Sequence, residues 1–178
     1  MQKGRVAALA LIWAATSLLL LQAETVPVPE YAWGSKKAAL TSALGAGRCT
    51  EFRPSDRPKY RNKILSYITA IDADLESKIV IVRTESKPVI DYLFVNDRLY
   101  TVMENWGQVD PATEKSIQSR LGGRFGQPII QKDTNLHIYS YNNDTTKVLC
   151  YFTRLPEGAA QCKVYYYTRK LFRMLITE

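Results

Sequence analysis

Short runs of alternating apolar and polar residues predict that most of the chain after residue 63 is antiparallel β-structure. In the first half these runs are ILSYITAI, KIVIVRT, VIDYLFV and RLYTVME, and in the second half LHIYSY, TKVLCYFT, CKVYYYT and LFRMLI. Turn-forming stretches separate them, as in DADLES, ESKP, ND, NND and LPEG, and this spacing is typical of meanders. The sequence therefore predicts two antiparallel meanders, one in each half.

Each predicted meander follows a segment with helical spacing. In GSKKAALTSALGAG, Ser35 is placed to cap a helix that ends at the following glycines. In DPATEKSIQSRLGGRFG, Asp110 is the expected N-cap and Gly122 or Gly123 the expected end. A helix followed by strands in both halves predicts an α+β fold of two tandem helix-plus-antiparallel-meander modules. We expect them to form one curved antiparallel sheet with the helices on one face.

Two similar stretches support a duplication. DYLFVNDRLYTVM at Asp91–Met103 and KVYYYTRKLFRML at Lys163–Leu175 each contain an aromatic strand, a turn and a second strand that begins with Leu and an aromatic residue. The ends of the two helical segments match in the same order. We therefore expect a first αβ module at residues 34–106 and a second at residues 107–178. Coincidence between two amphipathic hairpins is the alternative.

The first 23 residues have the layout of a secretory signal peptide. Lys3 and Arg5 precede an apolar run at residues 6–21, and small and polar residues follow. The run is slightly shorter than the roughly 20 residues that cross a bilayer as a helix, and an uncleaved anchor is the alternative. A Pro-punctuated tether at residues 24–33 follows. The expected location is therefore periplasmic or secreted, or anchored in a membrane by residues 6–21.

The charge balance argues against nucleic acid as a partner. The chain has 24 Lys and Arg against 17 Asp and Glu, a net charge of +7 that falls to +5 when Lys3 and Arg5 leave with the signal. This excess is too small and too interrupted for a nucleic-acid-binding face. The loop RCTEFRPSDRPKYRNK is basic and could touch an anionic membrane surface or an acidic partner, a solvated loop being the alternative. Its candidate contact residues are Arg53, Arg57, Lys59 and Arg61.

A two-residue turn at Asn96-Asp97 would decide which strand residues share a face. The face expected to lie under the helices contains Ile90, Tyr92, Phe94, Leu99, Thr101 and Met103. The other face has no helix predicted over it, and aromatic side chains with a charged rim are typical of protein-binding surfaces. This predicted partner-binding face contains Leu93, Val95, Tyr100, Val102, Tyr165, Tyr167, Phe172 and Met174. The alternative is that it forms the core.

The helical segment Gly34-Ser35 through Leu44-Gly45, followed by a meander with the hairpin Phe-Val-Asn-Asp-Arg-Leu, resembles the module of the SmpA/OmlA (BamE-type) envelope proteins. It is also similar to the tandem fold of the β-lactamase-inhibitor proteins. The resemblance covers most of residues 31–176 and implies a curved antiparallel sheet whose concave face binds a protein. The first family's lipid-bearing cysteine and the proline expected after Leu44-Gly45 are absent. The resemblance therefore implies the fold more than a role in envelope assembly.

Few residues indicate chemistry. Cys150 and Cys162 flank a predicted hairpin loop and are expected to form a disulfide, two reduced buried thiols being the alternative. Cys49 is expected to be a free buried thiol or to take part in another pairing. The chain has one histidine, His137, so neither a histidine-based triad nor a zinc site is indicated. No cofactor is expected.

These features together predict a secreted or periplasmic, non-enzymatic protein-binding module that uses an aromatic-rich sheet face. One alternative is a membrane-anchored accessory or scaffold subunit of an envelope complex. The other is an enzyme of unknown class, whose residues would have to gather from distant positions.

Overall fold

The computed structural model describes residues 33–45, 47–71 and 73–169. The chain divides into two compact units, residues 1–31 and 32–178, and the described residues all belong to the second. The predicted signal peptide or anchor, nearly all of the tether, and the last predicted strand with Phe172 and Met174 lie outside the described residues.

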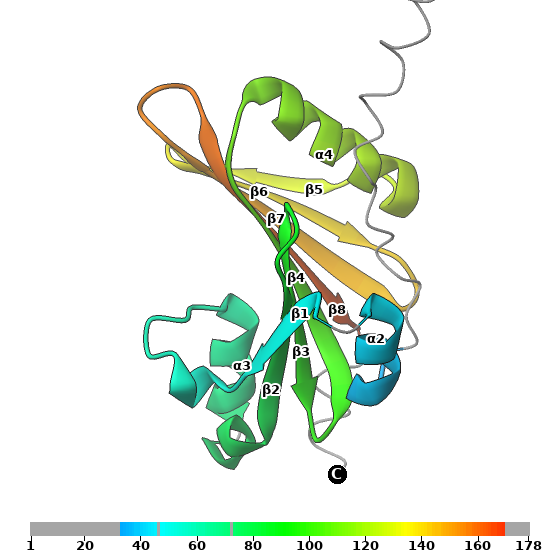
Figure 1. The fold of residues 1–178 in the computed structure, drawn as a ribbon. Helices are drawn as coiled ribbons and strands as arrows, with labels where there is room; N and C mark the ends of the chain where they lie inside the picture. Colours follow the sequence, from blue (N-terminus) through cyan, green and yellow to red (C-terminus); the bar gives the residue numbers. More distant parts are fainter. Residues whose placement is uncertain (1–32, 46, 72, 170–178) are drawn as a thin grey trace, which may run out of the picture. The chain divides into compact units, whose positions relative to one another are not determined.

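The described residues form three α-helices and one eight-stranded antiparallel sheet, which confirms the α+β fold (Figure 1). The α-helices are α2 (Lys37–Leu44), α3 (Lys63–Ile71) and α4 (Pro111–Phe125), with 3-10 turns at Pro54–Asp56 and Ala73–Lys78. The strands are β1 (Cys49–Phe52), β2 (Ile79–Thr84), β3 (Val89–Val95), β4 (Arg98–Val109), β5 (Ile129–Lys132), β6 (Leu136–Asn142), β7 (Thr146–Arg154) and β8 (Ala160–Thr168). Their order across the sheet is β1-β2-β3-β4-β8-β7-β6-β5.

Strands from the two halves of the chain meet at the centre of the sheet. β4 pairs with β8, from Thr101 opposite Tyr167 to Val109 opposite Ala160. The predicted module boundary between residues 106 and 107 therefore falls inside β4, and the two halves share one sheet. The division into two duplicated modules stays a prediction.

The segment ILSYITAI forms helix α3, so the prediction of a strand there is wrong. The side chain of Asn62 accepts hydrogen bonds from the backbone N–H groups of Ile64 and Leu65, at 2.9 and 3.4 Å, and so caps the first turn. Ile64 and Ile68, four residues apart, are both buried. Helical spacing of the buried residues, with a cap in front of them, outweighs the strand propensity of the isoleucines.

Helix α3 lies on the face of the sheet opposite to α2 and α4 (Figure 1). Tyr165 of β8 belongs to the core cluster that contains Ile64 and Ile68 of α3. The next residue, Tyr166, points to the other face, where its hydroxyl lies 3.3 Å from the Arg120 guanidinium of α4. The expectation that all helices cover one face is therefore wrong.

This position of α3 buries the aromatic face that the sequence predicted to bind a partner. The residues of that face in the core cluster under α3 are Leu93, Val95, Tyr100, Tyr165 and Tyr167, none more than 9% exposed. Val102 pairs with Tyr92 on the other face and is 3% exposed. The premise of an exposed aromatic surface is wrong for these six residues, because α3 covers the first five and Val102 is buried on the other face.

The β3–β4 hairpin turns at Asn96-Asp97 as predicted. Both residues have positive φ angles, 49° and 63°, as in the two-residue turns that match strand twist. A bulge follows, because Phe94 pairs with Leu99 whereas Leu93 pairs with Thr101. The extra residue reverses the facing of the rest of β4. The residues that change face relative to the prediction are Thr101, Val102 and Met103.

Helix α4 begins as predicted and ends later than predicted. The carboxylate of Asp110 accepts a hydrogen bond from the backbone N–H of Thr113 at 2.7 Å and caps the helix. Gly122 and Gly123 lie inside the helix. Gly126, with a φ of 81°, ends it, since this left-handed backbone is inexpensive only for glycine.

Helix α2 is joined to the edge of the sheet by an ion pair. The Lys37 ammonium lies 2.6 Å from a carboxylate oxygen of Glu51 in β1. Lys36 occupies the N-cap position of this helix and forms no side-chain cap. The prediction that Ser35 caps α2 is therefore wrong by one residue.

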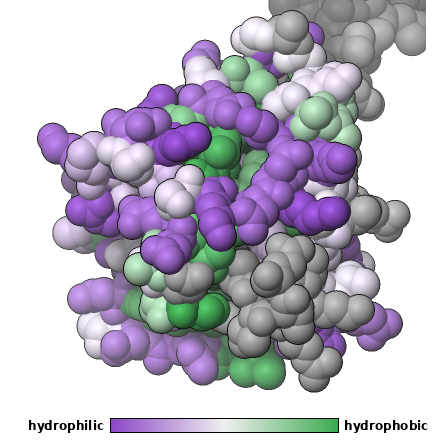
Figure 2. All heavy atoms as spheres, turned by 90° about the horizontal axis from the view of Figure 1, so that it is seen from below, coloured by the Kyte–Doolittle hydropathy of each residue, from purple (hydrophilic) through white to green (hydrophobic). Residues whose placement is uncertain are grey.

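Most of the surface is polar, and few large apolar side chains are exposed among the described residues. Figure 2 shows one face, on which hydrophilic side chains surround smaller apolar areas. Among the described residues, the large apolar side chains that are markedly exposed are Tyr67, Ile71, Ile129 and Ile130. The first two lie on α3 and the last two on the edge strand β5.

Candidate anion-binding groove

The loop between β1 and α3 is held in shape by its own hydrogen bonds. The backbone N–H of Arg53 donates to the Asp56 carboxylate at 2.9 Å. The Arg61 guanidinium donates to the carbonyl oxygens of Pro58 and Tyr60, at 2.6 and 2.9 Å. The basic loop predicted from the sequence is therefore a folded segment with defined side-chain directions.

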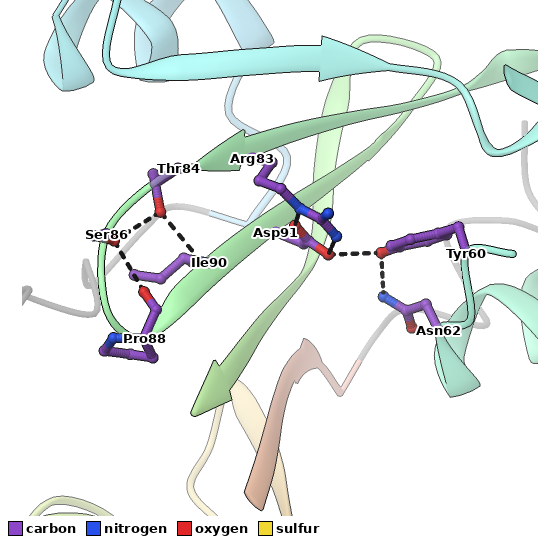
Figure 3. Close-up of polar contacts among 8 residues, drawn as sticks. All are labelled: Tyr60, Asn62, Arg83, Thr84, Ser86, Pro88, Ile90 and Asp91. Atoms are coloured by element: carbon purple, nitrogen blue, oxygen red, sulfur yellow. Dashed lines mark hydrogen bonds and ion pairs between the residues drawn. The ribbon is translucent and has the colours of Figure 1, made fainter. Parts of the chain in front are cut away.

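A buried carboxylate attaches this loop to the sheet (Figure 3). Asp91 of β3 is 0% exposed and receives two hydrogen bonds from Arg83 of β2, at 2.6 and 2.8 Å. The Tyr60 hydroxyl donates to the same carboxylate at 3.0 Å, and the Asn62 amide donates to the Tyr60 hydroxyl at 3.2 Å. Asp91 thus fixes both an arginine of the sheet and the end of the loop that leads into α3.

A second group in Figure 3 closes the turn between β2 and β3. The Thr84 hydroxyl accepts from the backbone N–H of Ile90 at 3.2 Å and lies 2.9 Å from the Ser86 hydroxyl. Ser86 donates to the carbonyl of Pro88 at 2.9 Å. These bonds hold the two strands in register beside the Arg83–Asp91 pair.

Aromatic rings support the arginines of this region. The rings of Phe52 and Tyr60 pack edge to face with centroids 5.4 Å apart. The Arg57 guanidinium lies 4.0 Å from the centre of the Phe52 ring, and that of Arg83 lies 5.2 Å from it. Both cations therefore make cation–π contacts. The N–H groups of Arg57 stay available to a ligand, whereas Arg83 donates two of its own to Asp91.

Between the loop and the sheet lies a pocket of about 790 Å³, which we call the basic groove. It is lined by Arg57, Pro58, Lys59, Tyr60, Arg61, Arg83, Met103, Asn105 and Lys163. Five of these side chains are cationic and none carries a carboxylate. In the part of the chain that the structure describes, only Arg83 of the five forms an ion pair. The groove thus gathers positive charge that its own walls do not neutralise.

The structure brings together most of the predicted basic residues and adds two. Arg57, Lys59 and Arg61 line the groove, and Arg53 does not. Arg83 and Lys163 complete it from β2 and β8. Sequence reasoning missed these two because strand pairing, and not proximity in the chain, brings them to the loop.

Burial and the neighbouring Asp91 carboxylate raise the pKa of Tyr60, since both disfavour its phenolate. An unfolded tyrosine loses its proton near pH 10, so above about pH 10 unfolding releases a proton that the native state retains. Stability then falls as the pH rises, by up to about 1.4 kcal/mol per pH unit for this group. We expect Tyr60→Phe to show a shallower fall than the wild type between about pH 10 and 11.5, measured by urea denaturation.

The exposed Tyr67 supplies the control for this prediction. Tyr67→Phe removes the hydroxyl of a tyrosine that is 45% exposed and lies outside the hydrogen bonds of Asp91, so a change of slope in both variants would not be specific to Tyr60. Equal slopes for Tyr60→Phe and the wild type would contradict the role of the buried hydroxyl.

Two further buried carboxylates attach α4 to the other face of the sheet. Glu104 accepts hydrogen bonds from Arg120 at 2.6 and 3.2 Å. Glu114 of α4 accepts two from Arg154 of β7, at 2.6 and 2.8 Å. Because each of these carboxylates is paired with an arginine, we assign a structural role to both acids.

His137 belongs to the second of these clusters. Its Nδ1 atom lies 2.7 Å from the Arg154 guanidinium, and burial and the Arg154 charge lower the pKa of the imidazole. The residues that the structure describes contain no group of three or more potential metal ligands.

The three cysteines are free thiols. The structure contains no disulfide between Cys150 and Cys162 and has instead the alternative of two buried thiols. Cys150 pairs with Val164 and Cys162 pairs with Phe152, so the two cysteines are not directly opposite each other. The two lie diagonally on adjacent strands, both 0% exposed. The hydrogen bond that Cys150 shares with the Cys162 side chain, together with burial, raises the pKa of the Cys150 thiol. Cys49 is half-buried at the start of β1.

Across residues 33–45, 47–71 and 73–169, no helix has the length and apolar character needed to cross a membrane. The candidate anchor at residues 6–21 lies outside these ranges. No known protein family, curated protein or solved structure matches this chain, so the resemblance to the SmpA/OmlA module stays a prediction from its sequence.

Proposed function

We propose that the protein is a non-enzymatic binding protein that takes an acidic segment of a partner protein into the basic groove. The observation that carries this proposal is the set of four cationic side chains, Arg57, Lys59, Arg61 and Lys163, that line one pocket without an ion pair among the described residues. Gathered like charges repel one another, and a bound anion relieves that repulsion. The interaction surface thus differs from the aromatic face expected from the sequence.

Carboxylates suit this groove in geometry as well as in charge. Arginine presents a planar fork of N–H donors that matches a carboxylate, and Arg57 is oriented by the Phe52 ring. The pocket is also lined by the uncharged side chains of Tyr60, Asn105 and Met103. A chain segment that carries Asp or Glu can fill such a pocket and contact cations on both walls.

An anionic membrane surface is the rival ligand. Lys59 and Arg61 are exposed and could reach lipid headgroups, whereas Arg83 and Lys163 are only partly exposed, at the side of the groove formed by the sheet. A flat bilayer reaches recessed cations less well than an extended polypeptide does. The shape of the groove therefore favours a protein segment.

Charge reversal in the groove tests the proposal. Lys59→Glu with Lys163→Glu removes two cations whose side chains form no hydrogen bond or ion pair in the described part of the chain. We expect this variant to bind poly-L-glutamate about tenfold more weakly or worse, because each lost charge contact is worth on the order of 1 kcal/mol. Fluorescence anisotropy at physiological salt measures the change.

The matched control carries the same change in net charge elsewhere. Lys115→Glu with Lys132→Glu alters two exposed residues of α4 and β5, which do not line the groove, and should bind almost as the wild type does. Equal loss in both variants would refute the groove as the binding site. Binding to phosphatidylglycerol vesicles in preference to poly-L-glutamate would favour the membrane surface instead.

The proposed location is periplasmic or secreted, and it is supported by the sequence of residues 1–23 alone. An anchored accessory subunit, held in a membrane by residues 6–21, would present the same groove. The non-enzymatic part of the proposal is supported by the buried acids Asp91, Glu104 and Glu114, each of which is occupied by an arginine.

A further inference from the structure

A smaller pocket of about 210 Å³ lies beside the basic groove on the same face of the sheet. Lys163 lines both, so the two pockets are adjacent. We propose that the partner segment is bipartite, with its acidic residues in the basic groove and an apolar side chain in the smaller pocket. This inference rests on the function proposed above and adds the chemistry of the ligand.

The smaller pocket is built from three neighbouring strands. Thr153 of β7 pairs with Leu136 of β6 and with Gln161 of β8, so the three side chains share a face. Tyr151 pairs with Lys163 on that same face. Lys63, the first residue of α3, also lines the pocket, which therefore lies where the start of α3 meets these strands.

Aromatic rings and one apolar side chain give this pocket its character. The rings of Tyr151 and Tyr165 pack edge to face with centroids 5.6 Å apart. Leu136 contributes the aliphatic part of the lining. The Lys63 ammonium lies 4.7 Å from the centre of the Tyr151 ring. An apolar side chain that enters here is removed from water against Leu136, the two rings and the aliphatic stems of Lys63 and Lys163, which also line the pocket.

Strand spacing fixes the separation of the two parts of the ligand. Lys163 lies on β8 and Leu136 on β6, two strand spacings away, which amounts to about 10 Å. An extended chain rises about 3.3 Å per residue. The apolar residue is therefore expected about three positions from the nearest acidic residue.

Two labelled peptides test this design on the full-length protein. Each has four consecutive glutamates followed by two glycines, and the last residue is leucine in one and serine in the other. We expect the leucine peptide to bind the wild type roughly tenfold more tightly, since most of one leucine side chain is removed from water. Equal affinity of the two would overturn the bipartite design and leave the proposed function intact, whereas no binding of either would refute the proposed function itself.

A pair of variants locates the apolar part. Leu136→Ser should abolish the preference for the leucine peptide, while Ile130→Ser, on the exposed edge strand β5, should retain it. Retention of the preference in Leu136→Ser would overturn the assignment to this pocket. Tighter binding of dodecyl phosphate than of the leucine peptide would overturn it in favour of an anionic lipid.

Discussion

Replacing Arg83 with alanine is expected to lower the free energy of unfolding by about 3–5 kcal/mol. Arg83 supplies both of the charged hydrogen bonds that Asp91 receives, and Asp91 is 0% exposed. Without the guanidinium, a carboxylate stays in a low-dielectric environment with the neutral Tyr60 hydroxyl as its remaining side-chain donor. Denaturation in guanidinium chloride at neutral pH measures the loss.

Three comparisons separate the charge effect from simple truncation. Lys115→Ala removes an exposed basic side chain of α4 and should change stability by less than about 0.5 kcal/mol. Arg83→Lys keeps the charge and loses the two-pronged geometry, so it should fall between Arg83→Ala and the wild type. The double variant Arg83→Leu with Asp91→Leu should recover much of the loss, because it buries no unpaired charge. A loss below about 1 kcal/mol in Arg83→Ala would show that water reaches the carboxylate.

The same ion pair connects stability to the proposed binding site. Asp91 holds Tyr60, and Tyr60 lies between Lys59 and Arg61 in the loop that forms one wall of the basic groove. A network that is fully hydrogen-bonded fixes the loop in one conformation before any ligand arrives. Preorganised cations cost a ligand less ordering entropy on binding.

Local sequence signals predicted the central part of the sheet well. Alternation located β2, β3, β4, β6, β7 and β8, and the Asn96-Asp97 turn joins two of them with the positive φ angles that such a turn requires. Asp110 identified the start of α4 through its capping carboxylate. Each of these features depends on residues close together in the chain.

The features that failed depend on contacts between distant residues. Ile64 and Ile68 fit a strand by propensity, and the hydrogen bonds of Asn62 and the core beneath them select a helix. The bulge between Leu93 and Phe94 reversed the facing of Thr101, and the alternation of apolar and polar residues in the sequence did not predict this bulge. The short strands β1 and β5 lie at the two edges of the sheet, where the alternation is too brief to read.

The basic groove also combines a part that nearby residues in the chain predict and a part that depends on distant residues. The sequence identified Arg57, Lys59 and Arg61 as part of a charged loop, but it did not show which other residues surround them in the groove. Arg83 and Lys163 come from strands separated by about 80 residues in the chain. A strand arginine next to a buried aspartate on the neighbouring strand looks, in sequence alone, like any surface ion pair.

Replacing Glu104 with alanine is expected to destabilise the protein by about 3 kcal/mol and to loosen α4 in particular. Glu104 is 2% exposed and accepts hydrogen bonds from Arg120, from Trp106 at 2.9 Å and from Tyr166 at 3.0 Å. Its loss leaves the buried Tyr166 hydroxyl and the Arg120 guanidinium short of an acceptor. The Nε atom of Arg120 is already buried without a partner in the described part of the chain. Without Glu104, few hydrogen bonds therefore remain to hold the Arg120 side chain in place.

Hydrogen exchange tells this outcome apart from a general loss of stability. In Glu104→Ala the amides of α4 should exchange faster than those of α3, because the Arg120–Glu104 ion pair joins α4 to the sheet and α3 lies on the other face. Glu104→Leu with Arg120→Leu should restore most of the stability, since it removes both charges and leaves an apolar contact between β4 and α4. Equal destabilisation in the double variant and in Glu104→Ala would mean that lost packing, and not the unpaired polar groups, governs the effect. Uniformly faster exchange in α3 and α4 would mean that Glu104 stabilises the sheet as a whole and not the attachment of this helix.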